Sequence, residues 1–153
     1  MSEPGFFLRK ATAADLPAIV AIEHESFVDP WNEETFLQAL ECWAETFFVA
    51  VVDREVAGFI VGGIEDTGEA VYGHICNFAV AERFRHRGIG RALVRSAEQQ
   101  FAIALAEGVQ LEVRYSNTAA QRFYRRRGYE PVFTVAGYYS NGEDAIVMMK
   151  WFF

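Results

Sequence analysis

The sequence predicts an α/β fold (α+β) in which a mixed central sheet is flanked by helices. The first observation is hydrophobic spacing: short apolar runs typical of strands are interspersed with the 3.6-residue repeats typical of helices. The second is the placement of capping residues and glycines, which divide these runs at turns and helix ends. The segments follow the order β-α-α-β-β-β-α-β-α-β-β, and such mixing predicts a sheet covered by helices.

The first half of the chain predicts one strand, two helices and two further strands. Residues 12–15, Thr-Ala-Ala-Asp, have the spacing of a capping box, with Asp in place of the usual Glu, and introduce the first helix. Residues 29–32 include a proline that breaks the helical pattern. The expected elements are a strand at 6–9, helices at 16–27 and 33–43, and strands at 47–52 and 56–64.

The second half predicts a strand, a basic loop and a long helix, followed by a strand, a helix and two strands. Residues 109–114 alternate strictly between apolar and polar side chains, as a strand with one buried face does. Asn117 is placed to cap the next helix, and Gly128 stands in the expected position after its end. The expected elements are strands at 74–80, 109–114, 131–139 and 145–153, with a helix that begins at Ile89 and ends at Gly108 and a helix at 117–127.

The basic glycine loop, residues 85–91, is the segment around which the chain is organised. A strand-to-helix turn points free backbone N–H groups and the positive end of a helix dipole at one spot. Gly88 and Gly90 let the backbone approach a ligand closely. In a chain of net charge −7, the four cationic or donor groups here predict an anion site, with a di- or triphosphate favoured, although an ordinary turn is the alternative. Those four groups belong to Arg85, His86, Arg87 and Arg91.

Two usual nucleotide-binding loops are excluded by the residues around these glycines. A Rossmann loop needs a third glycine where Leu93 stands, and a Walker loop needs a Gly-Lys-Ser/Thr sequence that the chain lacks.

The bulk properties predict a single globular domain, residues 1–153, with a substantial core. The chain has no run of 18 apolar residues and no basic-then-apolar leader, so we expect a soluble cytoplasmic protein with no membrane partner. Cys42 and Cys76 form no Cys-x-x-Cys pair and no metal spacing with the histidines, so we expect reduced thiols and no metal. The acidic balance argues against direct nucleic-acid binding.

Four segments of the chain resemble the GCN5-related N-acetyltransferase (GNAT) superfamily. The pattern Arg85-x-x-Gly88-x-Gly90 after a strand resembles its acetyl-CoA pyrophosphate loop. Residues 111–129, from Leu-Glu-Val-Arg to Gly-Tyr, resemble the second conserved block of the subfamily that acetylates protein N-termini, with RimI-type ribosomal-protein alanine acetyltransferases the most alike. Residues 138–148 resemble the late loop and last strand of those enzymes. Residues 27–31 resemble their loop between the first two helices, with Val28 and Asp29 as departures.

The resemblance implies a GNAT fold, with a mostly antiparallel twisted sheet and about four helices, and acetyl-CoA as co-substrate without a metal. The pyrophosphate would bind the glycine loop, and pantetheine would pair with the strand segment 78–80 as an added strand. A backbone N–H of that segment would face the thioester oxygen. The residues assigned to the cofactor in this way are Phe78, Ala79, Val80, Arg85, His86, Arg87, Gly88, Ile89, Gly90, Arg91, Asn117 and Phe123.

The resemblance also implies catalytic roles. Glu112 lies on the polar side of its strand, where a solvated glutamate is the alternative, and its motif position implies the general base. A carboxylate with the free-peptide pKa of about 4.3 is a poor base at neutral pH, so burial or a water relay is expected. His74, at the start of its strand, is the second candidate, with a structural role as the alternative. Tyr124 is implied to protonate the coenzyme A thiolate, although it could simply be a core residue.

The acceptor is expected to be an N-terminal α-amine. Deprotonating an α-amino group of pKa about 7.8 at pH 7 costs on the order of 1 kcal/mol, against roughly 4 to 5 kcal/mol for a lysine of pKa about 10.4. Tyr138 and Tyr139 could clamp the peptide, while Phe27, Pro30 and Trp31 could shape a pocket for its first side chain; in the alternative, all are core or surface aromatics.

The predicted function is therefore RimI-like acetylation of protein N-termini, such as Ala or Ser of a ribosomal protein, by a monomer or homodimer acting through a ternary complex. An acetyltransferase for small amines or lysine side chains, and a non-catalytic acyl-CoA-binding module, are the alternatives. The apolar tail, residues 149–153, is expected to finish a strand or to bury in a partner subunit.

Overall fold

The computed structural model describes residues 5–153, and its seven strands and four α-helices follow the predicted order. The strands are hydrogen-bonded in the order β1-β2-β3-β4-β5-β7-β6. The strands are β1 (Phe7–Lys10), β2 (Phe47–Val52), β3 (Glu55–Asp66), β4 (Val71–Val80), β5 (Gly108–Arg114), β6 (Glu130–Val135) and β7 (Ala145–Trp151). The helices are α1 (Leu16–Ser26), α2 (Glu33–Cys42), α3 (Ile89–Ile103) and α4 (Thr118–Arg126), with short 3₁₀ turns at Ala13–Asp15, Ala44–Thr46 and Glu82–Phe84.

The sheet is mixed and mostly antiparallel, as predicted. Antiparallel pairs join β1 to β2, β2 to β3, β5 to β7 and β6 to β7, whereas β4 and β5 are parallel. The chain divides into two compact units. The first unit comprises the residues up to Gly63 together with Ile75–Gln100, and the second comprises Ile64–His74 together with Phe101–Phe153. The single N-acetyltransferase domain expected over residues 1–153 stays a prediction.

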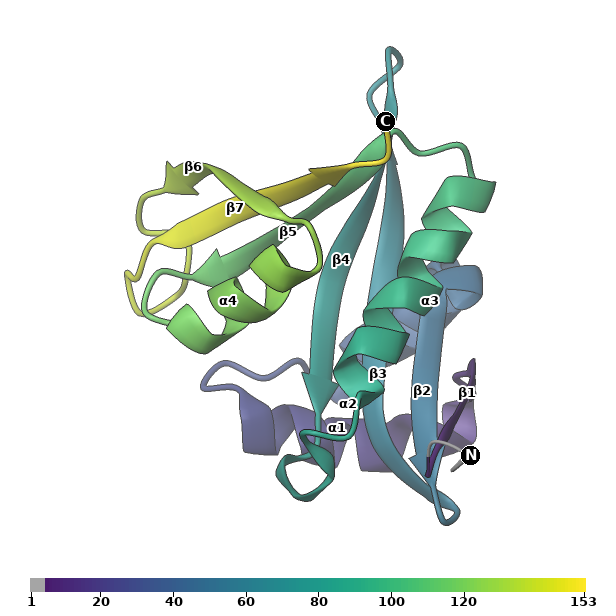
Figure 1. Ribbon diagram of the computed structural model, residues 1–153. Helices are drawn as coiled ribbons and strands as arrows, with labels where there is room; N and C mark the ends of the chain where they lie inside the picture. Colours follow the sequence, from purple (N-terminus) through teal and green to yellow (C-terminus); the bar gives the residue numbers. More distant parts are fainter. Residues whose placement is uncertain (1–4) are drawn as a thin grey trace. The chain divides into compact units, whose positions relative to one another are not determined.

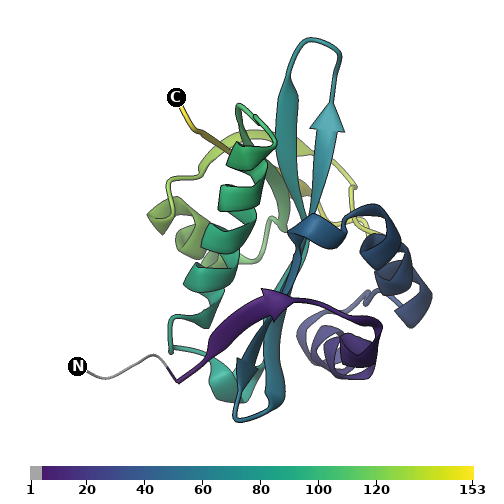
Figure 2. The same ribbon diagram turned by 90° about the vertical axis from the view of Figure 1, so that its right-hand side faces the viewer.

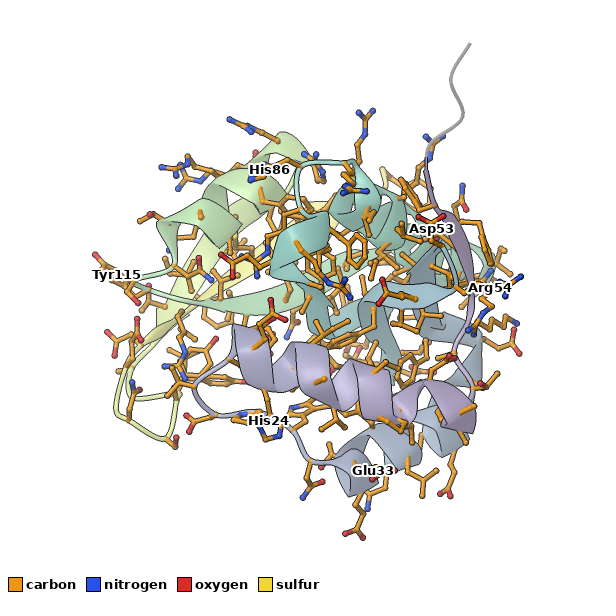
Figure 3. The ribbon with its side chains drawn as sticks, turned by 90° about the horizontal axis from the view of Figure 1, so that it is seen from below. His24, Glu33, Asp53, Arg54, His86 and Tyr115 are labelled. Atoms are coloured by element: carbon orange, nitrogen blue, oxygen red, sulfur yellow. The ribbon has the colours of Figure 1, made fainter. Side chains whose placement is uncertain are left out.

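The first unit has helices on both faces of its strands. Figures 1 and 2 show α3 along one face of β2, β3 and β4, and α1 and α2 against the other. Phe36 on α2 is fully buried and meets Phe59 of β3 edge to face, with ring centroids 5.3 Å apart. Asp53 and Arg54 make the tight β2–β3 turn with positive φ of 46° and 71°, as twisted hairpins require (Figure 3).

The second unit is built on β5, β7 and β6, with α4 alongside β5 (Figure 1). The alternation predicted for 109–114 is confirmed, because Val109, Leu111 and Val113 are buried and the residues between them are half-buried. The start of β4 pairs with β5 in parallel, with His74 opposite Gln110. Because parallel pairing fixes the register, it sets which polar side chains of β5 lie near His74.

Two predicted strands are shorter than expected. The strand expected at 131–139 ends at Val135, because Gly137 takes a positive φ of 61° and the chain becomes a loop. This places Tyr138 and Tyr139 on a loop between β6 and β7. The last strand ends at Trp151, and Phe153 is fully exposed, so only part of the tail finishes a strand. Within residues 5–153, no helix combines the length and apolar character that crossing a membrane requires.

Candidate active site

The basic glycine loop lies between β4 and α3 in the first unit, as predicted. The Nε of Arg85 donates a 3.1 Å hydrogen bond to the carbonyl of Val80 at the end of β4. His86 and Gly88 have positive φ of 65° and 85°, so the backbone turns sharply before the helix (Figure 3). Ile89 is 1% exposed and seats the first turn of α3 in the core. The loop is therefore anchored at both ends.

Cationic side chains surround this loop and are exposed to solvent. The guanidinium of Arg87 lies 5.4 Å from the ring centroid of buried Phe84, which holds its stem against the protein. The first N–H groups of a helix have no acceptor within the helix, so they remain available to an anion in front of α3. The loop can thus supply both charge and backbone donors to a phosphate group.

A buried carboxylate joins two segments of the first unit that the sequence assigns to ligands. Glu23 on α1 is 2% exposed and accepts hydrogen bonds of 2.9 Å from the Trp31 N–H and 2.8 Å from the Asn77 amide. Burial raises the pKa of Glu23, although both hydrogen bonds act in the opposite direction. Asn77 also accepts a 2.9 Å hydrogen bond from the N–H of Phe78. One network therefore links the α1–α2 loop to β4.

This network bears on the expected oxyanion donor. Because the N–H of Phe78 is bonded to Asn77, it could face a thioester oxygen only after Asn77 releases it. Glu23 itself was missed from the sequence. The available signal was its place on the buried stripe of α1, where Leu16 and Ile19 precede it at helical spacing.

The proposed acceptor residues of the first unit share the loop between α1 and α2. Phe27 is 38% exposed, Pro30 and Trp31 are half-buried, and the Trp31 ring lies 5.2 Å from that of Phe36. Asn32 caps α2 by accepting a 2.9 Å hydrogen bond from the N–H of Thr35. The loop is thus fixed at its end, and its role as a side-chain pocket stays a prediction.

In the second unit, the two candidate bases are partners. The Nε2 of His74 lies 2.9 Å and 3.0 Å from the carboxylate oxygens of Glu112, and its Nδ1 lies 3.0 Å from Glu65. The hydroxyl of Tyr138 donates a 3.1 Å hydrogen bond to Glu112. The side chains of His74 and Glu112 are 20% and 14% exposed. Residues that the sequence presented as rivals therefore form one cluster, which we call the Glu112 cluster (Glu65, His74, Glu112 and Tyr138).

The Glu112 cluster determines the acidity of Glu112. Burial, the largest single influence, raises the pKa of this carboxyl, whereas the hydrogen bond and positive charge of His74 lower it together with hydrogen bonds from Tyr138 and Gln110. The net pKa lies below its ordinary value. Burial is present as expected, yet it does not make Glu112 a stronger base.

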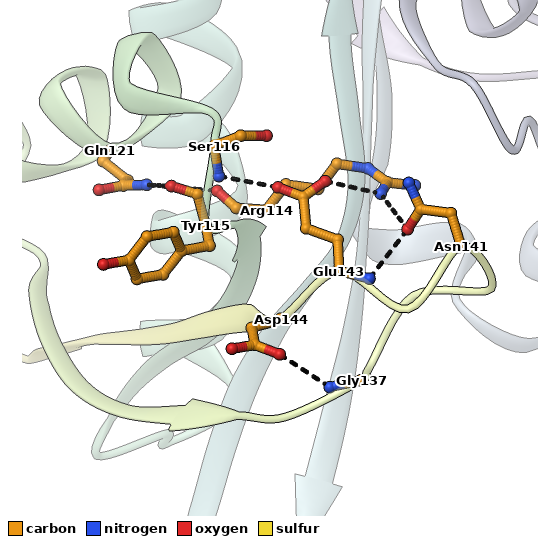
Figure 4. Close-up of polar contacts among 8 residues, drawn as sticks. All are labelled: Arg114, Tyr115, Ser116, Gln121, Gly137, Asn141, Glu143 and Asp144. Carbon is orange, nitrogen blue, oxygen red and sulfur yellow. Dashed lines mark hydrogen bonds and ion pairs between the residues drawn. The ribbon is translucent and has the colours of Figure 1, made fainter.

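The β6–β7 loop is tied to the end of β5 by Arg114 (Figure 4). One Arg114 nitrogen lies 3.1 Å from both Asn141 and Glu143, as Figure 4 shows by dashed lines. The guanidinium carbon of Arg114 also lies 4.0 Å from the ring centroid of Tyr139. Glu143 also accepts a 2.8 Å hydrogen bond from the N–H of Ser116. Burial raises the pKa of Tyr139 to about 12. This arrangement, which the sequence did not reveal, fixes the loop that carries Tyr138.

Tyr124 lies on α4 and is 6% exposed, with its ring 5.5 Å from that of Tyr129. Burial raises the pKa of Tyr124, so the phenol stays protonated at neutral pH. Asn117 caps α4 as predicted, accepting a 3.0 Å hydrogen bond from the N–H of Ala120. Phe123 is half-buried beside Tyr124, with ring centroids 5.2 Å apart. Their assignments to acid catalysis and cofactor binding stay predictions.

Comparison with known proteins gives the family. Residues 16–129 match the model of the acetyltransferase (GNAT) family. The chain belongs to this family. As a GNAT member it is an N-acetyltransferase that uses acetyl-CoA as acetyl donor. The exposed cationic groups and open N–H groups of its glycine loop fit the pyrophosphate of that donor. No group of three or more His, Cys, Asp or Glu side chains within residues 5–153 is placed to hold a metal ion.

Several relatives are similar to this GNAT chain over nearly its whole length. An uncharacterized N-acetyltransferase of Methanocaldococcus jannaschii is 40% identical, covering 94% of this chain and 90% of the relative. An N-alpha-acetyltransferase of Sulfurisphaera tokodaii is 33% identical, covering 92% and 90%. A putative ribosomal protein bS18-alanine N-acetyltransferase of Bacillus subtilis is 31% identical, covering 92% of each. The crystal structure of Ard1 from Thermoplasma volcanium is 30% identical, with a TM-score of 0.90, covering 96% and 97%.

Proposed function

We propose that this enzyme transfers the acetyl group of acetyl-CoA to the α-amino group of a protein N-terminus. The observation that carries the proposal is the Glu112 cluster, in which a carboxylate with a 14% exposed side chain lies 2.9 Å from His74 and accepts a 3.1 Å hydrogen bond from Tyr138. For this base, as for any other, an α-amine is the less costly acceptor, because its deprotonation at pH 7 costs about 1 kcal/mol against roughly 4 to 5 kcal/mol for a lysine. The similarity to the N-alpha-acetyltransferase of Sulfurisphaera tokodaii supports an α-amine as the acceptor.

The proposed reaction is direct attack within a ternary complex. The substrate ammonium gives a proton to Glu112, and the freed amine nitrogen forms a bond to the acetyl carbon while the carbon–sulfur bond breaks. Tyr124, kept protonated by burial, gives its phenolic proton to the departing thiolate. The acylated nitrogen then gives up its second proton, which returns through solvent to the Tyr124 oxygen, and Glu112 releases its proton to solvent. The residues of the glycine loop and of strand segment 78–80 would hold the donor, and Asn117 and Phe123 would add contacts.

On the acceptor side, Tyr138 and Tyr139 would bind the peptide backbone. Phe27, Pro30 and Trp31 would shape a pocket for a small first side chain, which favours Ala or Ser. The similarity to the putative bS18-alanine enzyme of Bacillus subtilis supports a ribosomal protein as substrate. The protein would act as a monomer or a homodimer.

Release of free thiol from acetyl-CoA with short peptides tests this function. The peptides begin with Ala, Ser, Met or Met-Glu, and an N-terminally blocked lysine peptide and spermidine are the controls. Turnover with Ala or Ser peptides supports the proposal. Turnover confined to spermidine or the blocked peptide would overturn the N-terminal acceptor, and tight coenzyme binding without turnover on any amine would point to a non-catalytic module.

A further inference from the structure

His74 is held by carboxylates at both of its ring nitrogens. On one side, Nε2 faces the proposed base Glu112 at 2.9 Å and 3.0 Å, and on the other, Nδ1 faces Glu65 of β3 at 3.0 Å. Glu65 is 50% exposed, whereas Glu112 is only 14% exposed. Neither the motifs nor the family resemblance gives Glu65 a role, because it lies near the end of β3, outside all four segments that resemble the family.

These two contacts fix the protonation and the orientation of the His74 ring. Ionised carboxylate oxygens only accept hydrogen bonds, so a ring with an N–H on each nitrogen satisfies both neighbours at once. Rotating the ring by 180° about its bond to Cβ would replace these nitrogens by C–H groups, which make no comparable bond. Glu65 therefore selects one ring orientation, as the carboxylate of a catalytic triad does for its histidine.

We propose that Glu65 is a positioning residue, which holds His74 so that its Nε2–H points at Glu112. This inference rests on the proposed function, in which Glu112 receives the substrate proton. Glu65 acts through His74: it keeps the N–H that stabilises the Glu112 anion in place, and it contributes negative charge that favours the protonated ring. The groups facing the His74–Glu112 pair are Glu65 from β3, Gln110 on β5 and Tyr138 from the β6–β7 loop.

The variant Glu65→Gln tests this role, with Glu69→Gln as a matched control. Glu69 is exposed in the β3–β4 turn, so its substitution makes the same charge change a few residues away. With the preferred peptide, we expect E65Q to lower kcat about tenfold, because Glu112 loses the His74 N–H that orients its carboxylate. This loss, which exceeds the gain from a stronger base, is part of the roughly 10²–10⁴ that a general base contributes. The acid limb of its kcat/KM profile should move to higher pH by about one unit, because the pKa of Glu112 rises once His74 no longer stabilises its anion.

An equilibrium measurement separates this inference from the function on which it rests. In E65Q, the His74 ring should titrate at lower pH by NMR than in wild type, whereas E69Q should match wild type. E65Q indistinguishable from E69Q in both profile and ring titration would overturn the role of Glu65, even with an active wild-type enzyme. A wild-type protein inactive on every peptide would overturn the proposed function, while a shifted ring titration would still support the Glu65–His74 contact.

Discussion

Replacing Arg114 by alanine removes the side chain that ties the β6–β7 loop to β5. The residue makes two 3.1 Å contacts, with Asn141 and Glu143, and stacks 4.0 Å from the centre of the Tyr139 ring. A charge-assisted hydrogen bond contributes about 1.5–3 kcal/mol, and an exposed cation–π contact about 0.5–1 kcal/mol. Because the Arg114 side chain is 20% exposed, solvent screening reduces this sum, and we expect about 2 kcal/mol of lost tethering.

That loss makes the release of the β6–β7 loop from β5 about 30-fold more favourable. If Tyr138 and Tyr139 bind the peptide, the KM for the peptide in R114A should rise by up to this factor, while the KM for acetyl-CoA stays unchanged. Steady-state kinetics with each substrate varied in turn gives both values. Hydrogen exchange of residues 137–144 should show faster exchange in the variant, which checks that the loop has been released.

Arg122→Ala is the matched control, because Arg122 is an exposed arginine on α4 and its loss makes the same charge change. R122A should have the same KM as wild type for the peptide and for acetyl-CoA. A released loop in R114A by hydrogen exchange, together with an unchanged peptide KM, would refute a role of Tyr138 and Tyr139 in peptide binding. The two tyrosines would then be surface aromatics without a part in peptide binding.

Three further substitutions test separate parts of the molecule. Tyr124→Phe should lower kcat about 100-fold if the phenol donates the proton, whereas Tyr129→Phe, which removes another buried hydroxyl, should not; thiol-release kinetics decide. Glu23→Gln replaces one of the two accepting oxygens by an amide NH2 group, which cannot accept the hydrogen bond made there. The free energy of unfolding in urea should fall by about 1–3 kcal/mol, and the peptide KM should rise. The hydrogen bond from Arg9 lowers the pKa of Asp15, so its stabilisation is present above the unfolded value of about 3.9 and lost as pH falls through the folded one. Asp15→Asn should therefore lower Tm at pH 7, and the difference from wild type should shrink below about pH 4.

Local patterns in the sequence were sufficient for the order of elements. Alternation in residues 109–114 correctly gave the buried face of β5, and Gly128 follows α4 with a positive φ of 97°. The capping box at Thr12 and Asp15 is formed as the spacing indicated. These features depend on neighbours within a few residues, so the sequence contains all the information that they need.

The contacts that build the candidate site depend on register and could not be read in this way. Alternation places Glu112 on the polar side of β5, but only the parallel pairing with β4 brings it to His74. Glu65 meets His74 across a strand pair, and Arg114 meets Glu143 across a gap of 29 residues. The alternation of apolar and polar residues predicts which face of the sheet a side chain lies on. Which residue it meets on a neighbouring strand depends on the register between strands, which only the three-dimensional structure shows.

The partners of Glu112 also bear on how the enzyme would distinguish α-amines from lysines. The ordinary pKa values of these amines differ by about 2.6 units, which is about 3.5 kcal/mol in the cost of deprotonation whatever the base. Lowering the pKa of Glu112 through His74 and Tyr138 adds the same cost for both amines, so it slows both without changing their ratio. The preference for α-amines at the deprotonation step therefore comes from the pKa values of the amines and not from Glu112. Selectivity beyond about 3.5 kcal/mol would have to come from residues that touch the peptide, for which Tyr138 and Tyr139 in one unit and the α1–α2 loop in the other are the proposed candidates.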